Sequence, residues 1–224
     1  MARSPRPPEG GASGGLTLPP FYPILDVDIA QARGLNLERV LDAWLEAGVR
    51  LVQLRAKPMH GAALLALAET CRARTREAGA IFIVNDRIDV ARLVEADGAH
   101  VGQDDLPPAA ARRLLGDGPI LGWSTHNEAQ LQAARAEPID YVAIGPVFQT
   151  GSKERPDPVV GLDGVRRAKE LAAGRPVVAI GGITLDRAVD VLRAGASTVA
   201  VIGDVMVSDA AARAREFVAV TSTC

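Results

Sequence analysis

Apolar and polar positions follow a regular order along the chain from Phe21 onward. Runs of four or five mostly apolar residues are each followed by a polar or glycine-containing loop, and then by a segment with apolar residues at helical spacing. The segment 37–47 is typical of the helices, since Val40 and Trp44 fall on one face and Gly48 ends it. The eight runs that we predict to be β-strands are Tyr22–Leu25, Leu51–Leu54, Ile81–Val84, Gly98–Val101, Ile120–Trp123, Tyr141–Ile144, Val177–Ile180 and Thr198–Ile202.

Eight β units separated by helices, in a chain of 224 residues, predict a single-domain α/β fold, the parallel (β/α)8 TIM barrel. A doubly wound open sheet is the alternative, but such sheets usually carry fewer strands. In a barrel, the loops that follow all eight strands meet at one end of the ring. Residues far apart in the sequence then become neighbours at a single site.

Composition limits the domain and its partners. Residues 1–18 are rich in Pro, Gly, Ser and Arg, and they predict a disordered N-terminal extension that leaves residues 19–220 as the catalytic barrel. The chain is 48% hydrophobic but only 4% aromatic, so we expect a core of Ala, Val, Leu and Ile. A net charge of −2 provides no electrostatic case for a nucleic-acid partner or an anionic membrane surface.

Targeting and redox signals favour a cytoplasmic protein. No stretch approaches the length of a membrane span, and the N-terminus lacks the apolar core of a secretory signal. Cys71 continues the apolar face of a helical segment, and Cys224 ends the sequence. We therefore expect neither a structural disulfide nor a thiolate metal site.

Cations and carboxylates follow three consecutive predicted strands. Gln53, Arg55 and Lys57 come at the end of the second strand and share one of its faces. Asp86 follows the third strand, and Asp105 follows the fourth. Carboxylates at neighbouring strand ends repel one another unless a cation lies between them, and Mg²⁺ with Lys and Arg is what a bound pyrophosphate requires. The sequence therefore predicts a magnesium-assisted diphosphate site.

These residues also have a purely structural interpretation. The basic side chains of the second strand then form a salt-bridged rim, and Asp86 caps the helix that follows it. Asp104 and Asp105 are likewise placed to cap a helix that opens near Pro107. Of these two, we expect Asp105 to be the metal ligand and Asp104 to be a helper or a cap.

Hydroxyl, imidazole and ammonium groups follow the fifth and sixth strands. The Ser124 hydroxyl is expected to bond a phosphate or to take part in proton transfer, and no nucleophile-elbow pattern supports an acyl-enzyme. His126 either begins the next helix or acts as a base, and we interpret His100 as structural. The segment 145–159 predicts a mobile loop that brings Lys153 to the departing phosphate.

Glycines follow the last two strands, in Gly181-Gly182 and Ile202-Gly203. Backbone N–H groups at these positions of a barrel, together with a helix N-terminus, form a recurrent phosphate site. We therefore predict two anion sites, a metal-assisted one near the second to fourth strands and a metal-free one near the last two.

Taken together, these strings resemble the thiamine phosphate synthase family. The strings that carry the resemblance are Gln53-x-Arg55-x-Lys57, Asn85-Asp86-Arg87, Gly102-Gln103-Asp104-Asp105, Gly122-x-Ser124-x-His126, Gly145-Pro146-Val147-Phe148-x-Thr150-x-Ser152-Lys153 and Ile180-Gly181-Gly182-Ile183. They occur in the family's order and span essentially all of residues 20–218. The resemblance implies a transferase that condenses hydroxymethylpyrimidine diphosphate with hydroxyethylthiazole phosphate, giving thiamine phosphate and pyrophosphate.

The resemblance also implies roles for individual residues. It places the Mg²⁺ cofactor on Asp86 and Asp105, and it makes Ser124 and Lys153 the catalytic residues, with Ser124 on the pyrimidine. The residues it implies for the diphosphate are Gln53, Arg55, Lys57, Asn85 and Lys153. For the loop around both substrates it implies Thr150 and Ser152. For the thiazole phosphate it implies Gly182, Ile202 and Gly203.

Three positions depart from the family pattern. Gly203 stands where the family commonly has Ser, which removes one hydroxyl contact to the thiazole phosphate. Gln149 replaces a usual Pro, and Ala56 replaces a common Glu. The departure at Gly203 bears on the affinity for the thiazole phosphate more than on the reaction itself.

Two other functions fit parts of the pattern. A thiazole tautomerase-like enzyme of the same fold also carries Ser-x-His after the fifth strand, but it has no pyrophosphate to stabilise. The other function is that of a non-catalytic phosphate-sensing barrel, but such a protein has no need of the metal ligands. The family resemblance further implies a homodimer whose partners are otherwise small-molecule substrates.

Overall fold

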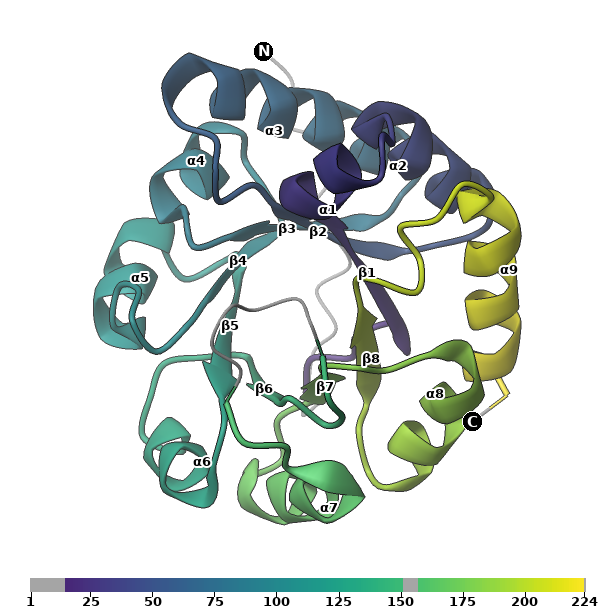
Figure 1. Cartoon of the computed structure of the whole chain (residues 1–224). Helices are drawn as coiled ribbons and strands as arrows, with labels where there is room; N and C mark the ends of the chain where they lie inside the picture. The colour runs from purple at the N-terminus through teal and green to yellow at the C-terminus, as the bar shows by residue number, and fades with distance from the viewer. Residues whose placement is uncertain (1–14, 151–156, 224) are drawn as a thin grey trace.

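The chain forms the closed parallel barrel that the hydrophobic pattern predicts. In the computed structural model, which describes residues 15–150 and 157–223, the strands pair in sequential order and β8 closes the ring on β1 (Figure 1). The strands are β1 (Phe21–Asp26), β2 (Leu51–Arg55), β3 (Ile81–Asn85), β4 (Gly98–Val101), β5 (Ile120–Thr125), β6 (Tyr141–Ile144), β7 (Val177–Ile180) and β8 (Thr198–Val201). The open-sheet alternative is therefore wrong.

Helices surround the ring on its outer side (Figure 1). They are α1 (Val27–Ala32), α2 (Leu37–Glu46), α3 (Gly61–Glu77), α4 (Ile88–Leu93), α5 (Pro108–Leu115), α6 (Glu128–Ala134), α7 (Gly161–Leu171), α8 (Leu185–Arg193) and α9 (Ala210–Thr221). Within the described ranges, no helix has both the length and the apolar content needed to cross a bilayer.

Four strands run further toward the polar loops than the hydrophobic pattern predicts. β1 ends at Asp26, β2 at Arg55, β3 at Asn85 and β5 at Thr125, so residues expected in loops belong to the sheet. Strand residues are held by the ladder on both sides, which fixes the direction of their side chains. Polar groups at these strand ends are therefore positioned by the barrel rather than by its loops.

Two apolar layers hold the barrel together. The outer layer lies between the strands and the helices, and the inner one fills the ring with side chains that include Tyr22, Ile83 and Tyr141. Leu18 is buried in this inner cluster and Leu16 packs against it. Both residues fall inside the extension predicted for 1–18, so this part of it packs on the domain. Their apolar side chains fill the lower end of the ring, which is the end where the strands begin.

The glycine of the Gly122-x-Ser124 string has a packing role. A Cβ on Gly122 would lie 2.0 Å from Cζ of Tyr141, whose ring is fully buried inside the barrel. Only a residue without a side chain leaves room for that ring. Gly122 therefore lets Tyr141 place its hydroxyl beneath the site described next.

Candidate active site

Arg55 is held in place at the end of β2 by carboxylates from β1 and α1. Its Nη1 donates to Oδ2 of Asp26 at 2.5 Å and lies 3.5 Å from Oδ2 of Asp28. Asp26 is buried and also caps α1 by accepting from the Ile29 N–H at 2.9 Å. A buried carboxylate that holds an arginine in this way orients the remaining guanidinium donors toward the rim.

A chain of hydrogen bonds crosses the barrel interior beneath the rim. Nε2 of Gln53 donates to the Tyr22 hydroxyl at 2.8 Å, and that oxygen lies 3.4 Å from the hydroxyl of Tyr141. His100 then joins Tyr141 to Ser124, with its Nδ1 2.9 Å from the tyrosine oxygen and its Nε2 2.8 Å from Ser124 Oγ. Burial raises the pKa of both tyrosines well above the ordinary value, so both hydroxyls stay protonated.

Two carboxylates and a lysine meet at the ends of β3, β4 and β2. Nζ of Lys57 lies 3.2 Å from Oδ2 of Asp86. Burial and the neighbouring carboxyl of Asp105, through a hydrogen bond and charge repulsion, raise the pKa of Asp86 to about 6, while Lys57 opposes the shift. Asp86 also adopts a φ of 60°, the left-handed region that Asp tolerates better than most side chains. The two carboxylates are thus crowded together at one point on the rim.

Neither acidic residue caps the helix that follows it. The N-cap of α4 is Arg87, and α5 begins after Pro107, and neither helix has a side-chain cap bond. Asp105 instead accepts from the Gly102 N–H at 2.7 Å, which folds its carboxylate back toward the barrel mouth. Asp104 is exposed. The helix-cap interpretation of Asp86 and Asp105 is therefore wrong.

The donor set suits Mg²⁺ rather than a metal enclosed by protein. In the part of the chain that the structure describes, no group of three or more His, Cys, Asp or Glu is placed to hold an ion. Mg²⁺ is usually bound through one or two carboxylates, with water and substrate phosphate completing an octahedron. The repulsion that raises the pKa of Asp86 is what a divalent cation between the two carboxylates would relieve.

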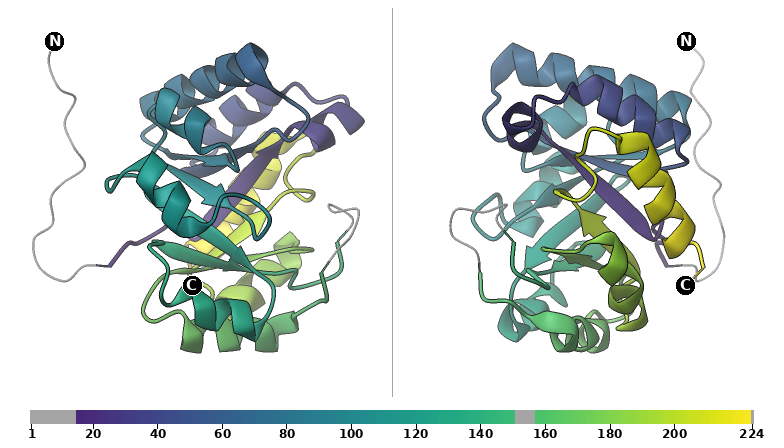
Figure 2. Two further views of the ribbon diagram at one scale, coloured as in Figure 1. Left: turned by 90° about the vertical axis from the view of Figure 1, so that its left-hand side faces the viewer. Right: turned by 45° about the vertical axis from the view of Figure 1, so that its right-hand side comes forward.

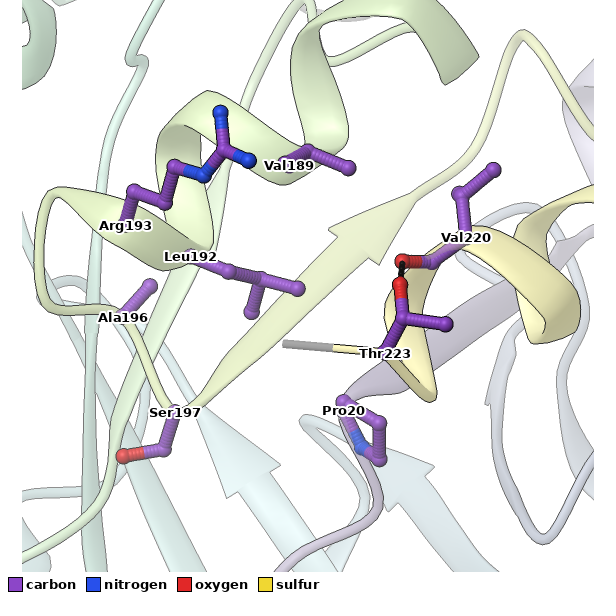
Figure 3. A pocket seen from close by; sticks show the side chains of 8 residues that line it. All are labelled: Pro20, Val189, Leu192, Arg193, Ala196, Ser197, Val220 and Thr223. Atoms are coloured by element: carbon purple, nitrogen blue, oxygen red, sulfur yellow. Dashed lines mark hydrogen bonds between the residues drawn. The ribbon is translucent and has the colours of Figure 1, made fainter.

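A cavity of about 240 Å³ opens beside these groups, and Lys57, Asn85 and Asp86 line it. A larger hollow of about 550 Å³ lies at the opposite end of the barrel, where α8 and α9 end (Figure 3). Its lining is mostly apolar and includes Leu192 and Val220. Since the lower end of such barrels serves stability, we place the site at the smaller cavity.

The turns after β7 and β8 are shaped for close approach of backbone. Gly181 and Gly182 have φ of 101° and 64°, and a Cβ on Gly182 would lie 2.4 Å from the Gln149 carbonyl oxygen. Among residues 15–150 and 157–223, the N–H groups of Gly182 and Gly203 have no hydrogen-bond partner. Ile202 and Gly203 are partly exposed on the β8 turn. These amides are available to an anion, and the phosphate site expected at these turns stays a prediction.

His126 ties the two stems of the loop between β6 and α7. Its Nδ1 lies 2.6 Å from the Gly145 carbonyl oxygen and 3.5 Å from Oδ2 of Asp157. A ring nitrogen that donates to a carbonyl is not available as a base. Thr150 is half-buried on the first stem. The remaining loop predictions, Ser152 and Lys153, lie outside the described residues.

The comparisons with known proteins agree on one family. The model of the family described as thiamine monophosphate synthase matches residues 21–205. A thiamine-phosphate synthase of Koribacter versatilis is 42% identical over 205 residues, which cover 91% of this chain and 96% of that protein. One of Moorella thermoacetica is 46% identical over 187 residues, 82% of this chain and 88% of that one.

A solved structure extends the similarity to three dimensions. The thiamine phosphate pyrophosphorylase from Pyrococcus furiosus superposes on this chain with a TM-score of 0.82 at 32% sequence identity. The superposition covers 92% of this chain and 96% of that one. The similarity therefore extends over most of the barrel.

Proposed function

The chain belongs to the thiamine monophosphate synthase family and is an enzyme that forms thiamine phosphate, and we propose that it does so by a dissociative, magnesium-assisted substitution. The substrates are hydroxymethylpyrimidine diphosphate and hydroxyethylthiazole phosphate, and pyrophosphate is the second product. A single observation supports this mechanism most strongly. Cations and crowded carboxylates share the rim above β2, β3 and β4, with Lys57 Nζ 3.2 Å from Asp86.

The diphosphate end of the reaction falls to β2 and β3. Arg55, Lys57 and Asn85 bind the phosphate oxygens, and Asp26 keeps the Arg55 guanidinium aimed at them. Asp86 and Asp105 would hold Mg²⁺, which would supply further neutralisation of the negative charge on the leaving pyrophosphate. Lys153, with Ser152 beside it, is proposed to approach the same oxygens from the β6–α7 loop.

The pyrimidine end falls to Ser124, whereas Gln53 belongs with the residues proposed for the diphosphate. Ser124 Oγ accepts from the pyrimidine amino group, and this contact is steadied by His100 at 2.8 Å. The bond between the pyrimidine methylene carbon and the diphosphate oxygen breaks, and its electron pair leaves with pyrophosphate. The resulting pyrimidine cation needs no covalent partner on the enzyme, because orientation and electrostatics supply the stabilisation.

The thiazole is positioned by its own phosphate. The free N–H groups of Gly182 and Gly203 hold that phosphate, with Ile202 beside them and Thr150 on the facing loop. The thiazole nitrogen then donates its lone pair to the cationic carbon and forms the new C–N bond. Holding both partners in one pocket turns a bimolecular step into an effectively unimolecular one.

We further propose that the enzyme works in the cytoplasm as a homodimer, with residues 19–220 as its catalytic domain. Cys71 is a free thiol buried in the core, and burial raises its pKa to about 12. An inert, reduced cysteine of this kind suits a reducing compartment. Light scattering behind a sizing column measures the oligomeric state directly.

The decisive experiment follows pyrophosphate release in a coupled assay. Release should require Mg²⁺ and both substrates together, and Asp105→Asn should lower turnover about a hundredfold or more. Isomerisation of a thiazole carboxylate phosphate without pyrophosphate release would instead identify a tautomerase. Binding of the phosphates without turnover would identify a sensor. Full activity of Asp105→Asn would exclude it as a metal ligand.

A further inference from the structure

Arg33 lies outside every string that pointed to the site, yet it contacts the turn after β8. It follows α1 directly, and its Nη1 donates to the carbonyl oxygens of Gly203 at 2.6 Å and of Met206 at 2.8 Å. Figure 2 shows α1 beside the segment that connects β8 to α9. The guanidinium is thus anchored on the second predicted anion site by one of its nitrogens.

Among the residues that the structure describes, the positive charge of Arg33 has no counter-ion. Within the described residues no carboxylate lies within ion-pair distance of it, and its Nε and Nη2 make no hydrogen bond. Arg55, by contrast, is paired with Asp26 at 2.5 Å. An exposed guanidinium with a fixed end and unused donors is the form in which arginine binds a phosphate.

The unused donors face the open side of the turn. A Cβ on Gly203 would lie 3.7 Å from Arg33 Nη2, and no other described atom outside residues 202–204 lies within 4 Å of that position. Because residue 203 has no side chain, an anion seated on the Gly203 N–H is within reach of this nitrogen. The turn and the guanidinium together offer backbone and charged donors to one ligand.

Asp204 follows Gly203 in the chain, and its protein partners offset the repulsion between its carboxylate and such an anion. Oδ2 of Asp204 accepts from the Leu185 N–H at 2.8 Å, and Oδ1 lies 3.5 Å from Arg213. Arg187, in the first turn of α8, is already engaged: it donates to the Gly182 carbonyl at 3.2 Å and covers the ring of Phe148. Arg33 is therefore the cation best placed to receive an anion at the β8 turn.

We propose that Arg33 binds the phosphate of the thiazole substrate and supplies the positive charge of the second anion site. The inference rests on the proposed function, which places that phosphate on Gly182 and Gly203. It adds a residue from the connection between α1 and α2 to a site otherwise built from backbone. The charge makes the site selective for the phosphorylated thiazole over its alcohol.

The test compares Arg33→Gln and Arg33→Lys with the wild-type enzyme. Calorimetry measures the Kd for hydroxyethylthiazole phosphate and for the unphosphorylated alcohol, and the pyrophosphate assay gives kcat and KM. Arg193→Gln is the matched control, because Arg193 is 74% exposed at the far end of α8. Arg33→Gln should weaken binding of the phosphate about tenfold or more and raise its KM similarly.

A role in phosphate binding also fixes what should stay unchanged. Binding of the alcohol and kcat at saturation should change less than about twofold, and Arg33→Lys should recover part of the phosphate affinity. Equal losses for phosphate and alcohol would reduce Arg33 to a clamp on the turn, and no loss for either would overturn the proposal outright. If the wild-type enzyme released no pyrophosphate, the proposed function would fail, while the Kd values would still decide the role of Arg33.

Discussion

Asp86 illustrates at the level of one residue how the site costs stability. Its carboxylate is partly buried, faces a second carboxyl and sits on backbone with a φ of 60°. Burial and Asp105 raise its pKa to about 6, above the ordinary 3.8. A carboxyl with a raised pKa in the folded state binds its proton more tightly there than in the unfolded chain. Stability from this group is therefore full below about pH 4 and is lost as the pH rises through 6.

Asp86→Asn should accordingly stabilise the metal-free protein at pH 7.5. We expect a gain on the order of 1–2 kcal/mol, a few degrees in Tm, because Asn carries no charge and also tolerates positive φ. Loss of the ion pair with Lys57 subtracts little, since that lysine is half exposed. Thermal unfolding between pH 4.5 and 8 measures the effect.

The pH dependence of the Tm difference tests whether the charge of Asp86 is its cause. The difference in Tm between Asp86→Asn and the wild type should shrink as the pH falls toward 4.5, where the wild-type carboxyl is protonated. The same variant should release almost no pyrophosphate. A constant difference in Tm across the whole range would contradict the assignment of the strain to the Asp86 charge.

At the scale of elements, a series of side-chain hydrogen bonds, the hydrogen-bonded chain, links the strands β2, β1, β6, β4 and β5. His100 on β4 has one ring nitrogen on Tyr141 and the other on Ser124, so it couples the barrel interior to the residue proposed to contact the pyrimidine. Side chains in one such network do not contribute independently. His100 is therefore a positioning residue for Ser124.

A double-mutant cycle tests this coupling. Ser124→Ala and His100→Asn should each lower kcat about tenfold, and the double variant should be no slower than the slower single variant. Tyr22→Phe is the control, since it removes a hydroxyl toward the Gln53 end of the hydrogen-bonded chain and leaves the contact between His100 and Ser124 intact. Additive losses in the double variant would show that His100 does not act through Ser124.

The loop between β6 and α7 leads to a second prediction at this scale. His126→Ala should raise KM for the substrates about three- to tenfold, because the contacts to Gly145 and Asp157 disappear. His126→Asn, which retains a donor near the position of Nδ1, should restore most of the wild-type KM. The pH profile of kcat should be the same in all three proteins. Loss of the acidic limb of the pH profile in His126→Ala would revive the alternative of a catalytic base.

Element boundaries also show what the sequence can and cannot predict. The apolar runs in the sequence predict the eight strands. Asp86 and Asp105 become candidate site residues because each is a charged residue shortly after such a run. Asp26 was missed because it ends an apolar run and precedes a helix, where a cap is the ordinary interpretation. Tyr22 and Tyr141 look like core residues in sequence. Only the closed ring brings their hydroxyls within 3.4 Å of one another.

In the molecule as a whole, the two ends of the barrel have different tasks. The upper end, where the strands end, carries crowded charges, unpaired amides and a positive φ, all of which cost free energy of folding. The lower end carries Leu18 inside the ring and an apolar hollow between α8 and α9. Since the strands connect the two ends, burial at the lower end offsets the cost of the site at the upper end.

This division predicts that stability and activity separate by position along the barrel axis. Leu18→Ala should lower the free energy of unfolding by about 2–4 kcal/mol, because it empties a buried position in the inner cluster. Its kcat and KM at 25 °C should match the wild type, the opposite of the result expected for Asp86→Asn. Leu93→Ala, at a position 68% exposed, should change stability by less than about 0.5 kcal/mol. Urea unfolding and the pyrophosphate assay measure both quantities, and a tenfold loss of kcat in Leu18→Ala would show that the ends of the barrel are coupled.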